Sequence, residues 1–287
     1  MRIYVMPNPK KDIGLIYTER AIKELLSVKG NEVIISSMHV LSPELEGRCL
    51  RGEPEDSEYD IMLALGGDGS VIRASHYASK KGVPLLGINL GRMGYLCDIE
   101  PDEIPVLKTL CDPQGWMLEE RMMLKIEQLR LGEPISAPKH VLNDVALTHG
   151  AVSKLIRLEL FCNGTHAGKY GGDGLVVATP TGSTAYSLSA GGPIIDPNLS
   201  SICVTPICPH SLFSRSLIFG EGSVIEVANR CDMSGDLNVT LDGAGTFIPE
   251  VGDVIRITKS EMKTKLLRQK NKANGFCEVL YKKMAEK

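Results

Sequence analysis

Apolar residues in the first third of the chain follow two different spacings. Short continuous apolar runs have the length and composition of buried strands, at residues 3–6, 33–35, 61–65 and 84–89. Between them, segments 13–29 and 70–81 have the character of helices, the first with an apolar face and with Gly30 as its expected C-cap. This alternation predicts an α/β domain built on an open parallel sheet.

A polar stretch, residues 42–59, interrupts this alternation. It carries Pro43, Gly47, Gly52 and Pro54. Proline and glycine break regular structure, so we expect a mobile loop between the second and third strands of the predicted sheet.

Beyond Trp116 the apolar and polar residues alternate one by one. This period of two is typical of antiparallel strands with one buried face, and it occurs at residues 155–160, 224–227 and 254–257. Asn163-Gly164 is a strong signal for a tight hairpin turn. We therefore expect a mainly β domain at residues 113–262, which follows the α/β domain at residues 1–112.

The last segment, residues 263–287, is predicted to return to the first domain. A helix is expected from Asn274 to Lys287, because Phe276, Val279 and Leu280 lie on one side of it. We expect this helix to pack back on the α/β domain.

Composition restricts the class of protein further. The 287 residues have a net charge of −3, with 43% hydrophobic and 23% charged residues, as in soluble globular proteins. The negative balance argues against a nucleic-acid surface. No apolar run approaches the ~20 residues that span a bilayer, and the N-terminus predicts a strand and not a signal peptide. None of the eight cysteines forms a Cys-x-x-Cys pair, so zinc is not expected. These features predict a cytoplasmic protein that binds neither nucleic acid nor membranes.

The first candidate site is the sequence Gly66-Gly67-Asp68-Gly69-Ser70, directly after the apolar run 61–65. Glycines leave backbone N–H groups free to face an anion, and the following helix would direct its positive end to the same place. A carboxylate in such an anion site is unfavourable unless it has a chemical task. Asp68 is therefore the candidate acid–base residue.

A second candidate site lies between Gly171 and Pro193. A predicted strand at 175–178 leads into a dense group of hydroxyls, Thr181, Ser183, Thr184, Tyr186, Ser187 and Ser189. One or two hydroxyls would be an ordinary helix N-cap. Six within nine positions favour a polar pocket, because hydroxyls both donate and accept hydrogen bonds.

These segments, taken together, resemble the NAD kinase family, which phosphorylates the adenosine ribose 2′-hydroxyl of NAD to make NADP. The matching segments occur in the family's order: Gly66–Ser70, Gly87–Leu96, Asn143-Asp144, Asp173–Gly192 and Thr205–Leu212. The GGDG sequence is also present in lipid kinases and phosphofructokinases, whereas Thr179-Pro180-Thr181-Gly182-Ser183-Thr184-Ala185-Tyr186 is specific to this family.

The resemblance implies roles for the matching residues of the first domain. Asp68 would face the ribose 2′-hydroxyl as the catalytic acid–base residue. Gly67 and Gly69 would lie at the nucleotide, and Arg73 would lie near phosphate.

The resemblance also implies a binding site in the second domain. Asn143 and Asp144, the latter in place of the family's usual Glu, would bind ribose hydroxyls, and Tyr186 could stack on a base. The remaining contact positions implied by the resemblance are Lys154, Asp173, Thr184, Ala185, Ser187 and Ser189.

The substrates implied by the resemblance are NAD and ATP, together with Mg²⁺ or another divalent cation. Mg²⁺ usually keeps several waters and few protein ligands, so no residue is assigned as a metal ligand. A homodimer or homotetramer is expected. The sequence leaves open whether polyphosphate can replace ATP as the donor.

Two alternative functions remain open from the sequence. One is another GGDG-type kinase that acts on a lipid or a sugar phosphate, although the hydroxyl-rich segment is polar and not suited to a lipid. The other is a dinucleotide-binding regulator without catalysis, against which the presence of Asp68 argues.

Overall fold

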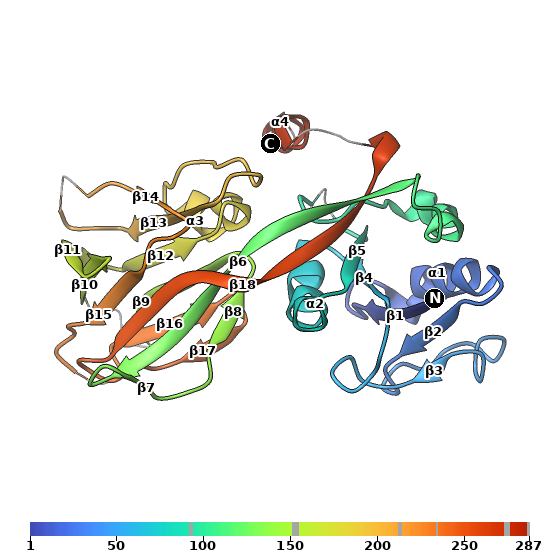
Figure 1. Cartoon of the computed structure of the whole chain (residues 1–287), viewed down its shortest axis with the longest axis horizontal. Helices are drawn as coiled ribbons and strands as arrows, with labels where there is room; N and C mark the ends of the chain where they lie inside the picture. The colour runs from blue at the N-terminus through green and yellow to red at the C-terminus, as the bar shows by residue number, and fades with distance from the viewer. Residues whose placement is uncertain (92–93, 151–154, 212–213, 234, 273–275, 286–287) are drawn as a thin grey trace. The chain divides into compact units, whose positions relative to one another are not determined.

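The computed structural model describes residues 1–91, 94–150, 155–211, 214–233, 235–272 and 276–285 (Figure 1). The chain forms two compact units. Unit 1 comprises Met1–Glu120 and Thr264–Lys287, and unit 2 comprises Arg121–Lys263. The sequence placed these divisions after residues 112 and 262. Two long strands, β6 (Trp116–Arg130) and β18 (Val254–Gln269), run through the points of division.

Unit 1 contains the predicted parallel sheet. Its strands are β1 (Arg2–Pro7), β2 (Glu32–Ile35), β3 (Leu50–Arg51), β4 (Ile61–Gly66) and β5 (Pro84–Asn89). They lie in the order β5-β4-β1-β2-β3, and the last part of β18 pairs with β5, also in parallel. The continuous apolar runs of β1, β4 and β5 are explained by this arrangement, because both faces of the sheet are covered.

Helices lie on both faces of this sheet. On one face, α1 (Ile16–Leu26), preceded by η1 (Ile13–Leu15), and η2 (Pro101–Thr109) share a core cluster with every second residue of the strands. On the other face lies α2 (Asp68–Lys81). Gly87 faces it, because a Cβ there would come within 2.7 Å of Val71. The predicted α/β architecture is therefore confirmed.

Three predicted boundaries in unit 1 are corrected by the structure. Helix α1 ends at Leu26 and not at Lys29, and the side chains of Ser27 and Asn31 donate to carbonyls of its last turn. Helix α2 begins at Asp68, two residues before the expected start. The predicted loop 42–59 contains the short strand β3, and Leu45 within it is fully buried.

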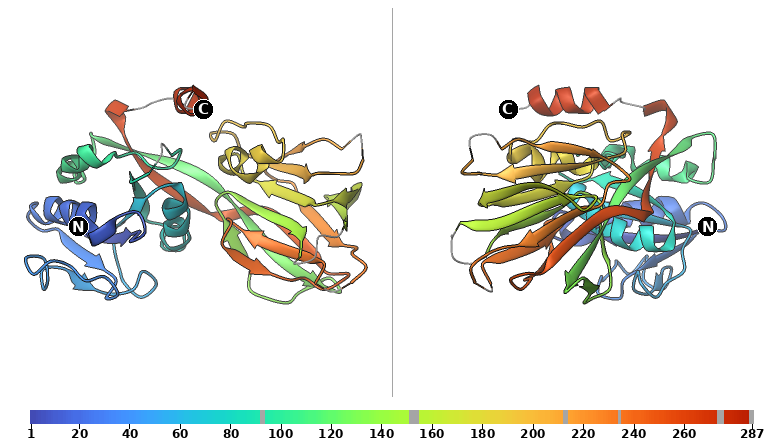
Figure 2. Two further views of the ribbon diagram at one scale, coloured as in Figure 1. Left: turned by 180° about the vertical axis from the view of Figure 1, so that it is seen from behind. Right: turned by 60° about the vertical axis from the view of Figure 1, so that its left-hand side comes forward.

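Unit 2 consists of antiparallel strands, as the period of two predicted. One sheet has the order β14 (Leu217–Gly220), β13 (Ser201–Ile207), β12 (Gly174–Ala178), β9 (Asp144–His149), β16 (Leu237–Leu241) and β17 (Gly245–Phe247). The other strands are β11 (Thr165–Gly172), β10 (Ile156–Cys162), β15 (Ile225–Asn229), β18, β6, β7 (Glu133–Pro134) and β8 (Lys139–Val141). Figure 2 shows the strands from two further sides. Inward-facing residues of both sheets form one core cluster.

The predicted hairpin turn at Asn163-Gly164 is confirmed. It joins β10 to β11 with φ of 50° at Asn163 and 75° at Gly164. Both values lie in the left-handed region that the two-residue hairpin turn requires. By contrast, strand β18 is much longer than the predicted segment 254–257, because it continues beyond its pairing with β15 and pairs in parallel with β5 of unit 1.

The C-terminal helix is present as α4 (Phe276–Ala285), after η4 (Lys270–Lys272). The Phe276 ring lies 6.2 Å from that of Tyr95, centre to centre, so the start of the helix contacts unit 1 as predicted.

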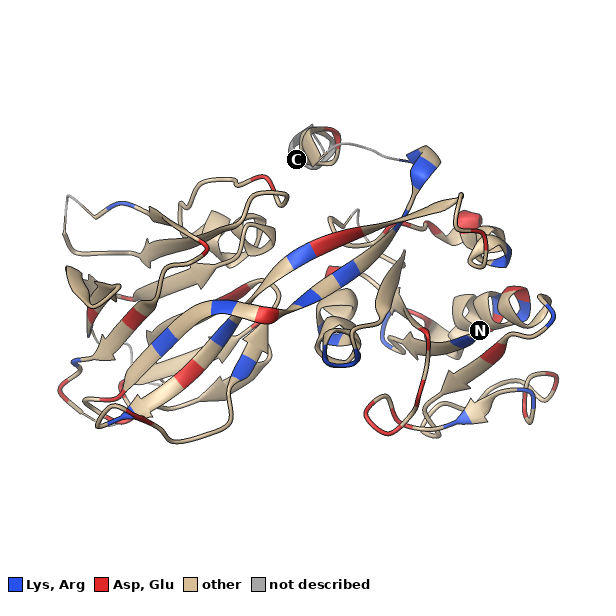
Figure 3. Cartoon of the chain, in the orientation of Figure 1, with Lys and Arg blue, Asp and Glu red and all other residues tan. Residues whose placement is uncertain are grey.

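Charges of both signs are interspersed along strands such as β6 and β18 (Figure 3). Within the described ranges, no helix is long and apolar enough to cross a membrane. The eight cysteines are free thiols.

The N-terminus of α1 depends on one buried carboxylate. Asp12 is 1% exposed, and its two oxygens accept hydrogen bonds from the N–H groups of Tyr17 and Thr18 at 3.0 and 2.8 Å. We expect Asp12→Ala to lower the free energy of unfolding by about 2 kcal/mol, because these buried donors lose their acceptor. Urea denaturation measures the change. Asp12→Asn keeps one acceptor oxygen and should lose less; equal losses for both variants would contradict this role.

Candidate active site

The glycine-rich segment lies at the point where the sheet of unit 1 changes direction. Strands β1 and β4 are parallel neighbours, with Pro7 opposite Leu65. From β1 the chain continues through α1 to β2, and from β4 it continues through α2 to β5, on the other side. Ligands of open parallel sheets bind at such a switch point, beyond the carboxyl ends of the strands. The two chain segments meet there, since Asn8 donates a hydrogen bond to the Ser70 hydroxyl at 3.0 Å.

The glycines of this segment are required by close packing. Gly66 has φ of 155°, and a Cβ on it would come within 2.1 Å of the Ser70 hydroxyl oxygen. Gly67 is the extended N-cap of α2. A Cβ on Gly67 or on Gly91 would lie 2.7 Å from the ammonium nitrogen of Lys11. Lys11 thus places a positive charge directly over the glycine loop.

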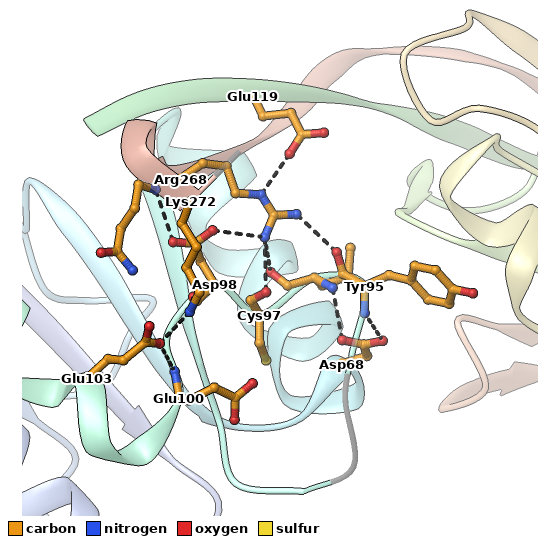
Figure 4. A network of polar contacts seen from close by, with 11 residues as sticks. Asp68, Tyr95, Cys97, Asp98, Glu100, Glu103, Glu119, Arg268 and Lys272 are labelled. Carbon is orange, nitrogen blue, oxygen red and sulfur yellow. Dashed lines mark hydrogen bonds and ion pairs between the residues drawn. The ribbon is translucent and has the colours of Figure 1, made fainter. Parts of the chain in front are cut away.

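Asp68 is the first residue of α2 and is half-buried. Its carboxylate accepts hydrogen bonds from the backbone N–H groups of Tyr95 at 2.8 Å and Leu96 at 3.0 Å (Figure 4). Gly94 makes this approach possible, because a Cβ there would come within 2.1 Å of Asp68 Oδ1. The positive end of the helix also favours a negative charge at this position. The structure therefore fixes a carboxylate beside the glycine loop.

The other residues predicted for this part of the site have different surroundings. Gly69 is exposed in the first turn of α2, next to Asp68. Arg73 is exposed on the same helix, and five residues at 3.6 per turn place it roughly 140° around the axis from Asp68. The structure thus brings Gly67, Asp68 and Gly69 together, but it does not direct Arg73 to them.

Unit 2 contains a pocket of about 360 Å³. Among its lining residues are four of the predicted ones, Asn143, Asp144, Ala185 and Tyr186. The first two lie where β9 begins, Ala185 lies between η3 (Thr181–Thr184) and α3 (Tyr186–Ser189), and Tyr186 is the first residue of α3. The pocket is completed by Ala146, Thr148, Thr240, Asp242 and Gly243.

Asp242 holds the backbone of the Asn143-Asp144 pair in place. Its carboxylate accepts hydrogen bonds from the N–H groups of Leu142, Asn143 and Asp144 at 2.9, 2.7 and 3.1 Å. On the other side, a Cβ on Gly182 would come within 2.1 Å of the Asn143 carbonyl oxygen, so only glycine allows the two segments to pack this closely.

The pocket has unusual electrostatics. Burial, with the nearby Asp242 charge as a second cause, raises the pKa of Asp144 to about 7. Burial also raises the pKa of Tyr186, and the charges of Asp144 and Asp173 add to this effect. The side-chain oxygen of Asn143 is buried and has no hydrogen-bond partner among the described residues. A buried acceptor without a partner is costly, so this atom is suited to a donor on a ligand.

Some hydroxyls of the segment 181–189 form hydrogen bonds within the protein. The Ser187 hydroxyl is fully buried and bonds to that of Thr205 at 2.9 Å, and the Thr184 hydroxyl donates to the Thr181 carbonyl at 3.3 Å. Neither residue lines the pocket, and Ser189 is exposed on α3.

Two predicted contact residues remain, Asp173 and Lys154. Asp173 lies between β11 and β12 and accepts a hydrogen bond from the Cys208 thiol, close to Tyr186. Lys154 lies outside the described residues.

The sequence analysis missed Lys11, Asp242 and the backbone donors of Tyr95 and Leu96. Lys11 could have been found, because it follows the first predicted strand and the carboxyl ends of neighbouring parallel strands lie together. Asp242 has no such signal, since a lone Asp before Gly243 is an ordinary turn sequence.

Within the described part of the chain, no three His, Cys, Asp or Glu residues are grouped so that they could hold a metal ion.

The raised pKa of Asp144 predicts a pH effect on stability. The folded state keeps this proton up to about pH 7, whereas the unfolded chain loses it near its usual value of 3.8. Stability should therefore fall as the pH rises between these values. We expect Asp144→Asn to gain on the order of 2 kcal/mol relative to wild type between pH 4.5 and pH 8. Urea denaturation at both pH values measures this gain, and Thr240→Val, a change without charge in the same pocket, should show none.

Comparison with known proteins agrees with this geometry. The family models described as ATP-NAD kinase N-terminal domain and ATP-NAD kinase C-terminal domain match residues 49–112 and 142–269. An NAD kinase of Acetivibrio thermocellus is 37% identical over 288 aligned residues, which cover 100% of this chain and 98% of that protein.

Solved structures show the same similarity. A yeast NADH kinase in complex with NADH has a TM-score of 0.87 at 26% identity, over 99% of this chain and 87% of that one. An NAD kinase from Archaeoglobus fulgidus in complex with ATP has a TM-score of 0.71 at 26% identity, over 98% of this chain and 99% of that one. With both family models matched and a relative of this identity over its whole length, the chain belongs to the NAD kinase family.

Proposed function

We propose that this protein transfers the γ-phosphoryl group of ATP to the adenosine ribose 2′-hydroxyl of NAD, with Asp68 as the acid–base residue. The observation that carries this proposal is the position of the Asp68 carboxylate. Two backbone N–H groups bind it, next to the glycine loop. The relatives solved with NADH and with ATP support the two substrates.

Asp68 is suited to orient an alcohol for attack. Its carboxylate is positioned by the helix start and by the N–H groups of Tyr95 and Leu96, so it cannot rotate freely. A carboxylate can accept further hydrogen bonds on its remaining lone pairs. The ribose hydroxyl would donate to it, and its proton would pass to Asp68 late in the transfer.

The glycine loop and Lys11 are suited to the phosphates of ATP. The N–H groups at the start of α2 point out of the helix end, which favours an anion. None of the described residues forms an ion pair with the Lys11 ammonium, which lies over Gly67 and Gly91. Mg²⁺ would enter with ATP and neutralise charge on the phosphates during transfer. Gly69 lies at the nucleotide in this proposal, whereas Arg73 could reach phosphate only from the outer side of α2.

The pocket of unit 2 is suited to the dinucleotide. Asn143 and Asp144 present acceptors to ribose hydroxyls, and the half-exposed ring of Tyr186 offers a face for a base. Asp173 and Ala185 would line the same ligand. Thr184 and Ser187 would act by holding the loop, and Lys154 and Ser189 remain proposed contacts on the grounds of the family resemblance alone.

We also propose a homodimer or homotetramer in the cytoplasm. The family resemblance supports the assembly, and the eight free thiols fit a reducing compartment. Light scattering coupled to size-exclusion chromatography measures the assembly.

The role of Asp68 predicts the effect of Asp68→Asn. The amide keeps the size of the side chain but cannot take up the proton, so turnover should fall roughly 10²- to 10⁴-fold. A coupled assay for NADP formed from NAD, ATP and Mg²⁺ measures this. The amide keeps only one acceptor oxygen for the two backbone N–H groups, so stability should fall by about 1–2 kcal/mol, while the protein stays folded and NAD binding stays near wild type.

Near wild-type turnover of Asp68→Asn would reject the acid–base role. Wild-type protein that phosphorylates a sphingoid base or fructose 6-phosphate instead of NAD would favour the other GGDG-type kinases. Wild-type protein that binds NAD but releases no ADP would favour a regulator without catalysis.

The position of Lys11 predicts a separate effect on ATP. Lys11→Met should raise the KM for ATP about tenfold, the usual size of one charge-assisted hydrogen bond, and leave the KM for NAD nearly unchanged. The neighbouring exposed residue provides the matched control, since Lys10→Met removes the same charge one position away. An equal rise in both variants, or none in Lys11→Met, would contradict a direct contact with phosphate.

A further inference from the structure

The segment that holds Asp68 is itself held by the end of β18. Arg268 lies one residue before the end of this strand, and its side chain is only 15% exposed. Figure 4 shows its guanidinium directed at the backbone of residues 95–97, on the side opposite to Asp68. All of these residues belong to unit 1.

The guanidinium of Arg268 uses its whole planar fork. Nη2 donates to the Tyr95 carbonyl at 3.0 Å, and Nη1 donates to the carbonyls of Leu96 and Cys97, both at 3.1 Å. Nε donates to the Glu119 carboxylate at 2.7 Å, which compensates the buried charge. Lysine cannot make these contacts together, because its donors radiate from a single nitrogen.

The following residues of the same strand and turn fasten the next part of the segment. The N–H of Gln269 donates to the Asp98 carboxylate at 3.0 Å. Lys272 donates to the Asp98 carbonyl at 2.7 Å and also forms an ion pair with Glu103. The end of β18 therefore binds residues 95–98 at several successive backbone positions.

One peptide unit links Arg268 to Asp68. The Tyr95 carbonyl, which accepts from Arg268, and the Leu96 N–H, which donates to Asp68 at 3.0 Å, belong to the same planar peptide group. A bond to the carbonyl therefore fixes the direction of the N–H. It also polarises the peptide and strengthens the donor, as in any chain of hydrogen bonds.

We propose that Arg268 is a positioning residue for the phosphoryl transfer, acting on Asp68 through the peptide between Tyr95 and Leu96. This inference rests on the role proposed for Asp68. Arg268 does not touch the reacting atoms; it keeps the carboxylate at the angle from which it can accept the ribose proton. Sub-ångström changes in such geometry reduce the rate of the chemical step more than they reduce substrate binding.

The test is the kinetics of Arg268→Lys, which keeps the charge and loses the fork. We expect kcat to fall about ten- to a hundredfold, with the KM values for ATP and NAD within about threefold of wild type. Arg256→Lys is the matched control on the same strand, where the arginine pairs only with Glu226 at 2.9 Å and binds no carbonyl in the described residues. Its kcat should stay near wild type.

A double-mutant cycle separates positioning from stability. If Arg268 acts through Asp68, then adding Arg268→Lys to Asp68→Asn should lower the residual kcat less than threefold. A purely structural role would lower kcat equally in both backgrounds, and that result would overturn the proposal. So would an unchanged kcat in Arg268→Lys while Asp68→Asn is impaired. Loss of the Asp68→Asn effect itself would instead reject the function proposed for Asp68.

Two further variants keep the test decisive. If Arg268→Lys does not fold, Arg268→Met, which has no donor for the Tyr95 carbonyl, is measured in the same way, and its kcat should fall by a similar factor. Glu119→Gln leaves the carbonyl contacts in place, so kcat should fall less than threefold. A fall in Glu119→Gln as large as that in Arg268→Lys would assign the effect to the ion pair, which contradicts action through the peptide.

Discussion

The hydrogen bonds from the N–H groups of Tyr95 and Leu96 to Asp68 are the contacts around which the candidate active site of unit 1 is arranged. They require α2 to begin at Asp68 and require the backbone to approach it without a side chain at Gly94. They also connect the helix start to β18, which brings Arg268 from the far end of the chain. Two backbone N–H groups thereby hold the carboxylate of Asp68 in place beside the glycine loop.

The order of the parallel strands explains why the glycine loop lies next to a lysine. Strands β1 and β4 are neighbours, and the chain leaves them in opposite directions. The carboxyl ends of these two strands therefore bring together the segment with Lys11, which follows β1, and the glycines, which follow β4. The positive charge of Lys11, the N-terminus of α2 and the carboxylate of Asp68 meet at the same place, a combination suited to phosphoryl transfer to an alcohol.

Unit 2 uses two carboxylates in different ways. Asp242 accepts three backbone N–H groups and fixes the turn before β9. Asp144, beside it, is buried and has its pKa raised to about 7. Burial is the larger cause, and the Asp242 charge adds to it. The pocket thus contains one carboxylate that supports the backbone and one that titrates near neutral pH. The charge that Asp144 presents to a ligand therefore depends on its burial and on the neighbouring charge of Asp242.

The sequence by itself determined the type of almost every element, the hairpin at Asn163-Gly164, the family and Asp68 as the candidate reactive group. These features depend on local spacing and on short segments of fixed residue types. Only the tertiary structure decided what surrounds Asp68, because Lys11 depends on strand order and Arg268 contacts Leu96 across 172 positions of sequence. It also decided that Ser187 is buried within the fold and that Arg73 faces away from the loop. Periodicity says that a residue is on a buried face, but not which other segment of the chain lies against it, since that is set by long-range pairing and packing.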